Sequence, residues 1–188
     1  MAKRRVAVLV GSLRKESYSL RLARALCALQ PESLELEILE IGDLPLYNQD
    51  LETDSPPPPW ARYRARLAAC EAVLFVTPEY NRGMSAATKN AIDVGSRPYG
   101  KGAINRKPCA VASSSPGALG GFGANHQVRQ SVVFLDMPMM QMPELYVGHV
   151  DKAVDAAGKP TSDGTRELFQ KFLEAFAAWI GKNAKPAS

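Results

Sequence analysis

Short apolar runs alternate five times with longer segments of helical periodicity along this 188-residue chain. The apolar runs predict strands over residues 4–11, 34–41, 72–77, 108–115 and 137–143. The segments between them carry apolar residues at helical spacing and predict helices over 19–29, 60–71, 86–96, 124–135 and 165–180. Such an alternation is typical of the α/β class, in which helices connect parallel strands.

Right-handed crossovers place helices on both faces of such a sheet. Five strands favour a flavodoxin-like, doubly wound parallel sheet with the strand order 2-1-3-4-5. We therefore expect one flavodoxin-like domain over 1–188, with Leu168 and Phe172 on the buried face of the last helix. The proline-rich stretch 42–59 is expected to be a surface loop, and 147–164 an excursion from the sheet.

Composition narrows the function classes. The formal net charge of +4 is spread along the chain, without the stripe of basic and aromatic residues typical of nucleic-acid binding. No apolar run approaches the roughly 18–20 residues of a membrane span, so we expect a cytoplasmic protein without nucleic-acid or membrane partners. Cys27, Cys70 and Cys109 lack metal-ligand spacing and the two histidines are isolated, which predicts buried free thiols and no metal site.

The segment after the first predicted strand, GSLRKESYS, combines hydroxyl groups with an arginine at the start of a helix. Free N–H groups and the positive end of the helix dipole favour a phosphate at such a position. Ser12, Ser17 and Ser19 add hydroxyl donors, and Arg14 adds a charged guanidinium. The triphosphate and dinucleotide motifs are both missing, so the pattern favours a monophosphate. In the alternative interpretation, Ser17 or Ser19 only caps the helix and Arg14 is solvated.

Two more polar loops follow the third and fourth predicted strands. PEYNRGMS places Tyr80 and Asn81 after Pro78, which suits a planar heteroaromatic ring with a hydrogen-bonding edge; the alternative is an ordinary surface turn. SSSPGALGG contains glycines that allow the backbone to approach a ligand, but such loops also occur without a ligand. In the expected topology, all three loops lie at the carboxyl edge of the sheet, where ligands bind in such folds.

These three segments resemble the NADPH-dependent FMN reductase family, a flavodoxin-like family that includes bacterial chromate, quinone and azo-dye reductases. The similarity extends over roughly residues 5–145 and rests on GSLRKES, on PEYN followed by KNAID, and on SPGALGG followed by RQ. The resemblance implies FMN as cofactor and NADPH or NADH as co-substrate. It also implies ping-pong transfer of a hydride through FMN to quinones or to similar acceptors, namely azo dyes, chromate and free flavin.

The resemblance further implies which residues contact FMN. Around the phosphate it points to residues of the first loop, namely Ser12, Leu13, Arg14, Ser17, Tyr18 and Ser19. Along the isoalloxazine ring and ribityl chain it points to Pro78, Glu79, Tyr80, Asn81 and Arg82, with Ser114 and Ser115 from the third loop. No side chain is assigned as a catalytic acid or base, because the hydride chemistry belongs to the cofactor.

The sequence departs from the family pattern at three places. Ser19 stands where relatives commonly have Asn, Gly83 and Met84 replace a segment that usually contains proline, and Val94 stands where Trp is frequent. We expect these changes to alter the substrate pocket more than FMN binding. Family members form dimers or tetramers, so the resemblance also implies a homo-oligomer, with the helix over 124–135 near the subunit contact.

Two other function classes stay open on the sequence. The first is a flavodoxin-type electron carrier, although such carriers usually present an acidic surface and this chain is basic. The second is a non-catalytic flavin-binding sensor that keeps the fold without turnover. The departures at Ser19 and Gly83 are compatible with it. Steady consumption of NAD(P)H with a small quinone separates the reductase from both.

Overall fold

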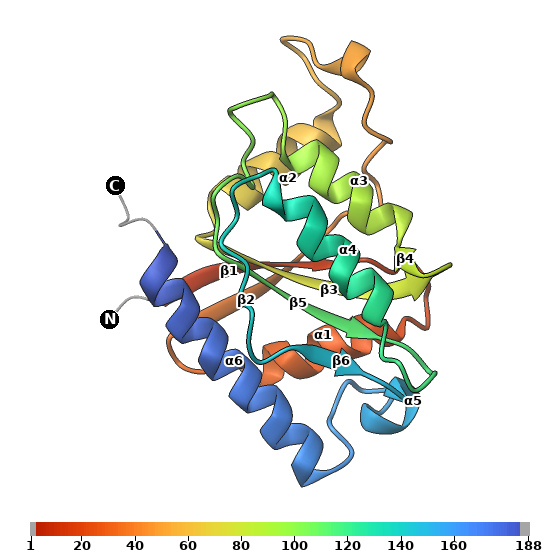
Figure 1. Cartoon of the computed structure of the whole chain (residues 1–188). Coiled ribbons are helices and arrows are strands. Elements are labelled where there is room, and N and C mark those ends of the chain that lie inside the picture. Colours follow the sequence, from red (N-terminus) through yellow and green to blue (C-terminus); the bar gives the residue numbers. More distant parts are fainter. Residues whose placement is uncertain (1–2, 185–188) are drawn as a thin grey trace.

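The computed structural model describes residues 3–184 and shows a central sheet with helices on both faces (Figure 1). Its five parallel strands are β1 (Arg4–Val10), β2 (Leu34–Leu39), β3 (Ala72–Tyr80), β5 (Cys109–Ser114) and β6 (Leu145–Val147). They lie in the order β2-β1-β3-β5-β6. Counting only the parallel strands along the chain, this is the order 2-1-3-4-5, so the predicted flavodoxin-like fold class is confirmed.

A sixth, short strand is not predicted by the sequence pattern. β4 (Gly83–Met84) pairs antiparallel with the last two residues of β3. Asn81 and Arg82 connect the two strands with φ values of 50° and 63°. Two consecutive residues with positive φ are typical of a two-residue hairpin turn. The segment expected to be a plain turn is therefore a β-hairpin at the carboxyl end of β3.

The last parallel strand lies later in the chain than predicted. The methionine-rich stretch 137–143 makes a single parallel bridge, between Met139 and Cys109, whereas β6 pairs with the end of β5. Pro138 and Pro143 lack the N–H group that a ladder needs, and they bracket the stretch. The prediction of a strand over 137–143 is therefore wrong, and the strand forms after the second proline.

The helices divide between the two faces of the sheet (Figure 1). One face is covered by α1 (Tyr18–Ala28) and α6 (Asp163–Asn183), with the short α5 (Val150–Ala153) beside them. The other face is covered by α2 (Pro58–Ala68), α3 (Ala86–Gly95) and α4 (Phe122–Val133). The short helix η1 (Gln49–Leu51) lies in the long connection between β2 and α2.

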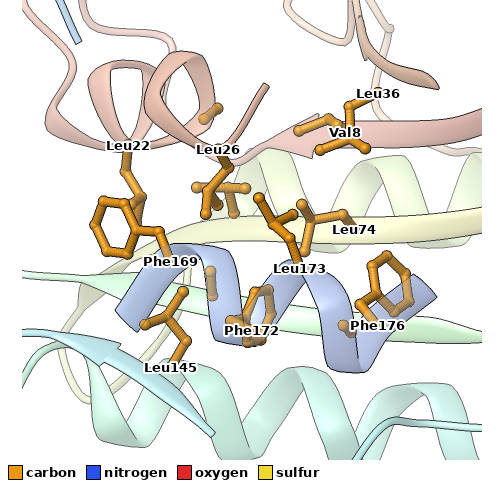
Figure 2. Packing of buried hydrophobic residues seen from close by; sticks show 14 of the residues in the cluster. Val8, Leu22, Leu26, Leu36, Leu74, Leu145, Phe169, Phe172, Leu173 and Phe176 are labelled. Atoms are coloured by element: carbon orange, nitrogen blue, oxygen red, sulfur yellow. The ribbon is translucent and has the colours of Figure 1, made fainter. Parts of the chain in front are cut away.

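In the core under α6, three phenylalanines of this helix pack among aliphatic side chains of the sheet and of α1 (Figure 2). Phe169, Phe172 and Phe176 are at most 1% exposed. Each such burial stabilises the fold by roughly 1.5–3 kcal/mol. Leu168, which was predicted to share this face, is 44% exposed, so that prediction is wrong. Phe169 takes its place: it lies three residues before Phe172 and seven before Phe176, and these spacings keep it on the buried side.

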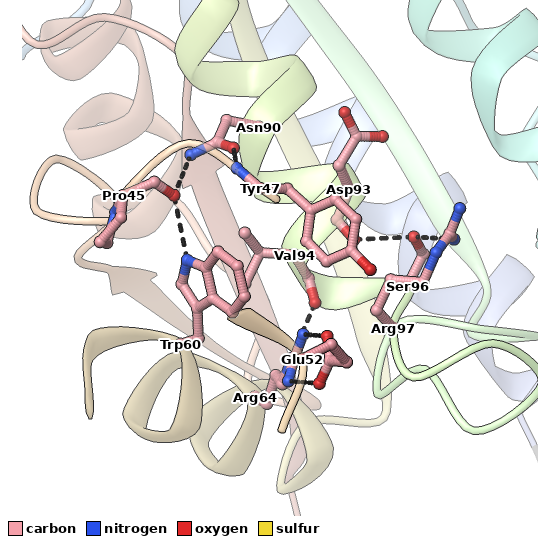
Figure 3. Close-up of polar contacts among 10 residues, drawn as sticks. All are labelled: Pro45, Tyr47, Glu52, Trp60, Arg64, Asn90, Asp93, Val94, Ser96 and Arg97. Carbon is pink, nitrogen blue, oxygen red and sulfur yellow. Dashed lines mark hydrogen bonds and ion pairs between the residues drawn. The ribbon is translucent and has the colours of Figure 1, made fainter. Parts of the chain in front are cut away.

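The long connection between β2 and α2 is fixed by polar contacts (Figure 3). Asn90 in α3 accepts the N–H of Tyr47 at 2.8 Å, and the Trp60 indole donates to a loop carbonyl at 3.0 Å. Arg64 forms a two-bond ion pair with Glu52, at 2.8 and 2.7 Å, and both side chains are shielded from solvent. The connection lies at the surface as expected, but it is held firmly against α2 and α3.

The cysteines are free thiols in this fold. Cys70 and Cys109 are buried as predicted, whereas Cys27 is half-buried. Desolvation by burial raises the pKa of the Cys27 thiol to about 11. Between residues 3 and 184, no group of three His, Cys, Asp or Glu side chains is arranged to hold a metal ion. Within the same range, none of the helices combines the length and hydrophobicity needed to cross a membrane.

Candidate functional site

Three loops meet at the carboxyl ends of β1, β3 and β5, as the topology predicts. Gly11, which follows β1, donates its N–H to the carbonyl of Val76 in β3 at 2.9 Å. The Ser85 hydroxyl, at the start of α3, donates to the carbonyl of Gly11. The hydroxyl oxygens of Ser19 and Ser114 lie 3.1 Å apart, and both side chains are buried. Hydrogen bonds therefore connect the first loop to both of the others.

Gly11 allows the first loop to lie directly on α3. A Cβ atom at this position would lie 2.0 Å from the Thr88 Oγ1 and 2.8 Å from the Ser85 Oγ. Ser85 is the N-cap of α3, and its Oγ accepts the N–H of Thr88 at 3.2 Å. Ser85 and Thr88 are not among the predicted site residues, although a serine before a helical segment is a recognised N-cap signal.

Ser17 has the capping role that the sequence left open. It is the N-cap of α1, and its Oγ accepts the N–H of Leu20 at 3.0 Å. A capping hydroxyl still has its own hydrogen to donate. Leu13 and Arg14 are exposed, and the Arg14 guanidinium lies 5.9 Å from the centre of the Tyr18 ring. Both side chains are therefore accessible to a ligand on the first loop.

The first loop offers donors to a ligand. From Ser12 to Glu16, the main-chain N–H groups make no hydrogen bond with any described part of the chain. The first turn of α1 contains no acidic residue, and the Glu16 carboxylate is paired with Arg21 at 2.9 Å. Free N–H groups, a helix N-terminus and the Arg14 guanidinium form a donor set that fits a phosphate monoester. The residues present thus fit the phosphate of FMN.

The second loop is the tip of the β3–β4 hairpin. Tyr80 is 50% exposed, and Asn81 and Arg82 are exposed at the turn. Pro78 lies opposite Ser114 in the register of β3 and β5. The hairpin therefore rises beside the third loop and presents an aromatic ring, an amide and a guanidinium along one edge.

Glu79 supports the hairpin rather than extending into the loop space. Its Oε2 accepts the N–H of Ala124 at 3.1 Å, and its Oε1 accepts from Arg82 at 3.0 Å. The N-cap of α4 is Gly121, which has no side chain to cap the helix. The Glu79 carboxylate supplies this cap from another element, where a negative charge also complements the helix dipole.

The departure at Gly83 has a structural reason. The Gln127 side chain of α4 accepts the N–H of Met84 at 2.6 Å. A Cβ atom on residue 83 would lie 2.7 Å from the same Gln127 oxygen. Glycine at this position therefore permits a second bond between the hairpin and α4, in addition to the bond made by Glu79.

The third loop contributes two different serines. Ser114 is buried against Ser19, as described above, whereas Ser115 is half-buried. The Ser115 Oγ accepts the N–H of Gly117 at 3.0 Å, and its own N–H donates to the carbonyl of Val147 at 3.1 Å. Ser115 is therefore the member of the pair that lies at the surface of the site.

A pair of titratable rings lies next to the third loop. The His126 Nε2 is 3.0 Å from the Tyr146 hydroxyl, and the Phe122 ring packs against both. Burial, and after it the hydrogen bond and charge of Glu144, raise the pKa of Tyr146 to about 12. The phenol therefore stays protonated at neutral pH.

Comparisons with known proteins agree with one another, because the matching family and the similar proteins are all named as reductases. Residues 4–152 match the family described as NADPH-dependent FMN reductase. The chain is 60% identical to a quinone reductase of Pseudomonas putida over 178 residues, 95% of each chain. It is 40% identical to a 2-hydroxy-1,4-benzoquinone reductase of a Burkholderia species, over 94% of this chain and 96% of the relative.

A solved structure shows the same arrangement. The flavoenzyme NAD(P)H:(acceptor) oxidoreductase of Paracoccus denitrificans matches with a TM-score of 0.90 at 41% identity. The match covers 97% of this chain and 100% of that one. The family resemblance seen in the sequence is thereby confirmed. The chain belongs to the NADPH-dependent FMN reductase family, whose members use FMN as cofactor and NAD(P)H as its reductant.

Proposed function

We propose that the protein is an FMN-dependent NAD(P)H:quinone oxidoreductase that works by a ping-pong mechanism. The observation that carries the proposal is the donor-rich first loop, joined by hydrogen bonds to the hairpin side and to the third loop. The names of the Pseudomonas and Burkholderia relatives support quinones as acceptors. Azo dyes, chromate and free flavin are further candidate acceptors for the same site.

The first loop is proposed to hold the FMN phosphate. The N–H groups from Ser12 to Glu16 and the hydroxyls of Ser12 and Ser17 supply neutral donors, and Arg14 supplies the opposite charge. Leu13 and Tyr18 flank these donors along the loop. We assign Ser19 a connecting role, because its hydroxyl is buried and bonded to Ser114.

The hairpin and the third loop are proposed to hold the isoalloxazine ring and the ribityl chain. Tyr80, Asn81 and Arg82 are exposed along the hairpin, with Pro78 at its base and Ser115 facing them from the third loop. Glu79 contributes by positioning: its carboxylate fixes the hairpin to α4 through Ala124. We therefore do not place the Glu79 carboxylate in contact with the flavin.

FMN, when bound, supplies two-electron transfer between NAD(P)H and an acceptor. The chain's task is to bind the cofactor at its phosphate, to orient its ring and to leave one face accessible to the two substrates in turn. No described side chain is assigned as the acid or base of the reaction. The exposed Arg82 guanidinium supplies a positive charge at the hairpin tip that attracts the anionic NAD(P)H.

The proposed enzyme is a cytoplasmic homo-oligomer. The first turns of α4 expose Phe122 (53%) beside Leu119 (61%), and the Phe122 ring packs on His126 and Tyr146. Exposed apolar groups of this kind are common at subunit interfaces. Light scattering at micromolar protein should give a multiple of the 20.4 kDa chain mass, and a monomer would contradict this part of the proposal.

The decisive experiment is an anaerobic absorption spectrum of the FMN-loaded protein. NADPH should bleach the flavin bands, and a small quinone should restore them, with steady NADPH consumption when both are present. A protein that binds FMN but is not reduced by NADPH would be a sensor. A protein that is reduced but passes electrons only to a protein partner would be an electron carrier.

A further inference from the structure

A separate cavity of about 700 Å³ lies at the opposite edge of the sheet from the three loops. Glu71 and Lys107, which line it, precede β3 and β5, so the cavity lies at the amino ends of these strands. Its other walls are the connection from α3 to β5 and the end of α4. Figure 1 shows this connection at the end of the sheet away from β4 and α5. The volume falls within the roughly 300–1,000 Å³ of small-molecule sites.

The charge of this cavity is positive and largely uncompensated. Arg97, Lys101 and Lys107 line it, and none of them forms an ion pair with the described residues. The two acidic residues in its wall are already paired: Glu71 with Arg4 at 2.8 Å, and Asp136 with Arg106 at 3.4 Å. Three cations therefore face the cavity without a carboxylate partner.

Two of these cations are held in place. The Lys107 ammonium donates to the carbonyls of Ala68, the last residue of α2, and of Cys70, and burial lowers its pKa. The Arg97 guanidinium donates to the Ser96 hydroxyl at 2.9 Å, and Figure 3 shows both residues at the end of α3. A fixed, partly desolvated cation interacts strongly with an anion, because little solvent or side-chain freedom is lost on binding.

The wall also contains an unpaired buried polar atom and two residues with left-handed backbone conformations. The Asn105 Oδ1 is buried and accepts no hydrogen bond from the described residues. Arg106 and Asp136 both adopt left-handed backbone conformations, with φ of 63° and 53°. A left-handed backbone at non-glycine residues and an unpaired buried polar atom are both unfavourable, and strained backbone of this kind clusters at active sites and ligand-binding sites.

The rim of the cavity carries two exposed aromatic rings. Tyr99 and Phe134 are 76% and 72% exposed, with ring centres 6.5 Å apart. We propose that this cavity binds a nucleoside phosphate, with its phosphate on Arg97, Lys101 and Lys107 and its base against Tyr99 and Phe134. Three unpaired cations favour a phosphate, with more than one negative charge, over a single carboxylate. Aromatic rings at the rim favour a ligand with a flat ring.

The test uses ADP as probe and the FMN-saturated protein, followed by isothermal titration calorimetry. We expect one ADP to bind per chain, and adenosine or inorganic phosphate alone to bind more weakly. Tyr99→Ala and Lys101→Ala should each weaken ADP binding by roughly tenfold, since one removes a stacking ring and the other a charge. Lys171→Ala on the exposed side of α6 removes the same charge elsewhere and should leave ADP binding unchanged.

Two results would overturn the proposal. One is the absence of ADP binding to the FMN-saturated protein. The other is ADP binding that both Tyr99→Ala and Lys101→Ala leave unaltered, because ADP would then bind elsewhere, such as over the flavin. NADPH–quinone turnover without ADP should be unchanged in both variants, so this test does not depend on the proposed reductase activity.

Discussion

The Glu79 Oε2 lies 3.1 Å from the main-chain nitrogen of Ala124, so a carboxylate at the end of β3 caps the first turn of α4. The same side chain is only 11% exposed and pairs with Arg82 through its other oxygen. Glu79 therefore stabilises the start of α4 and also fixes the position of the hairpin that is proposed to line the flavin.

Removing the Glu79 carboxylate should lower the stability of the fold. We expect Glu79→Ala to lower the free energy of unfolding by about 1–2 kcal/mol, because the N-terminal N–H of α4 loses its acceptor. Glu79→Gln keeps an acceptor oxygen and should lose less. Urea unfolding of the FMN-free protein measures the difference, with Glu174→Ala on the exposed side of α6 as control. Equal stability of Glu79→Ala and wild type would show that the cap is not needed.

Gly11→Ala should be strongly destabilising. The new Cβ would lie 2.0 Å from the Thr88 Oγ1, so α3 or the first loop must move, which typically costs about 1–3 kcal/mol or more. Adding Thr88→Ala removes the nearest clashing atom and should restore part of the loss. Gly181→Ala in α6 is the matched control, because nothing lies within 4 Å of its new Cβ. Thermal unfolding of the three variants measures these changes. An unchanged melting temperature for Gly11→Ala would contradict the close contact between Gly11 and α3.

The fold was largely predictable because the strands of a doubly wound sheet are buried on both faces. β1 and β3 therefore appear as continuous apolar runs, and the glycine and polar loops that end them mark the carboxyl edge. The missed features depend on tertiary contacts. β6 is three residues long and forms only where the end of β5 offers partners. β4 depends on positive φ values at Asn81 and Arg82. Because neither residue is glycine, the sequence gives no clear signal of these φ values.

The positions of the three loops were predictable from the sequence, whereas the contacts of their side chains were not. The sequence placed Ser12 to Ser19, Pro78 to Arg82 and Ser114 to Ser115 at one edge, and the structure brings them together. It could not distinguish a side chain that faces a ligand from one that holds the loops. Glu79 and Ser19 form hydrogen bonds with residues 45 and 95 positions away, and such partners are not visible in local sequence.

Arg14→Ala should weaken FMN binding without affecting folding. Arg14 is exposed and lies in the donor-rich first loop, where a charge-assisted hydrogen bond to phosphate is worth about 1.5–3 kcal/mol. This corresponds to a rise in Kd of roughly ten- to a hundredfold. Quenching of flavin fluorescence on titration measures Kd, and Arg24→Ala, further along α1 and also exposed, is the charge-matched control. An unchanged Kd for Arg14→Ala would contradict the proposal that the first loop binds the FMN phosphate.

The buried pair of Ser19 and Ser114 should show strong coupling in a double-mutant cycle. Ser19→Ala leaves the Ser114 hydroxyl without its partner 3.1 Å away, and an unpaired buried hydroxyl costs about 1–3 kcal/mol. Ser114→Ala should cost a similar amount for the same reason. The double variant removes both polar groups, so its loss should be smaller than the sum of the single losses. Urea unfolding of the four proteins gives the coupling energy. Additive losses would show that each hydroxyl has another partner and that the two loops are not joined at this point.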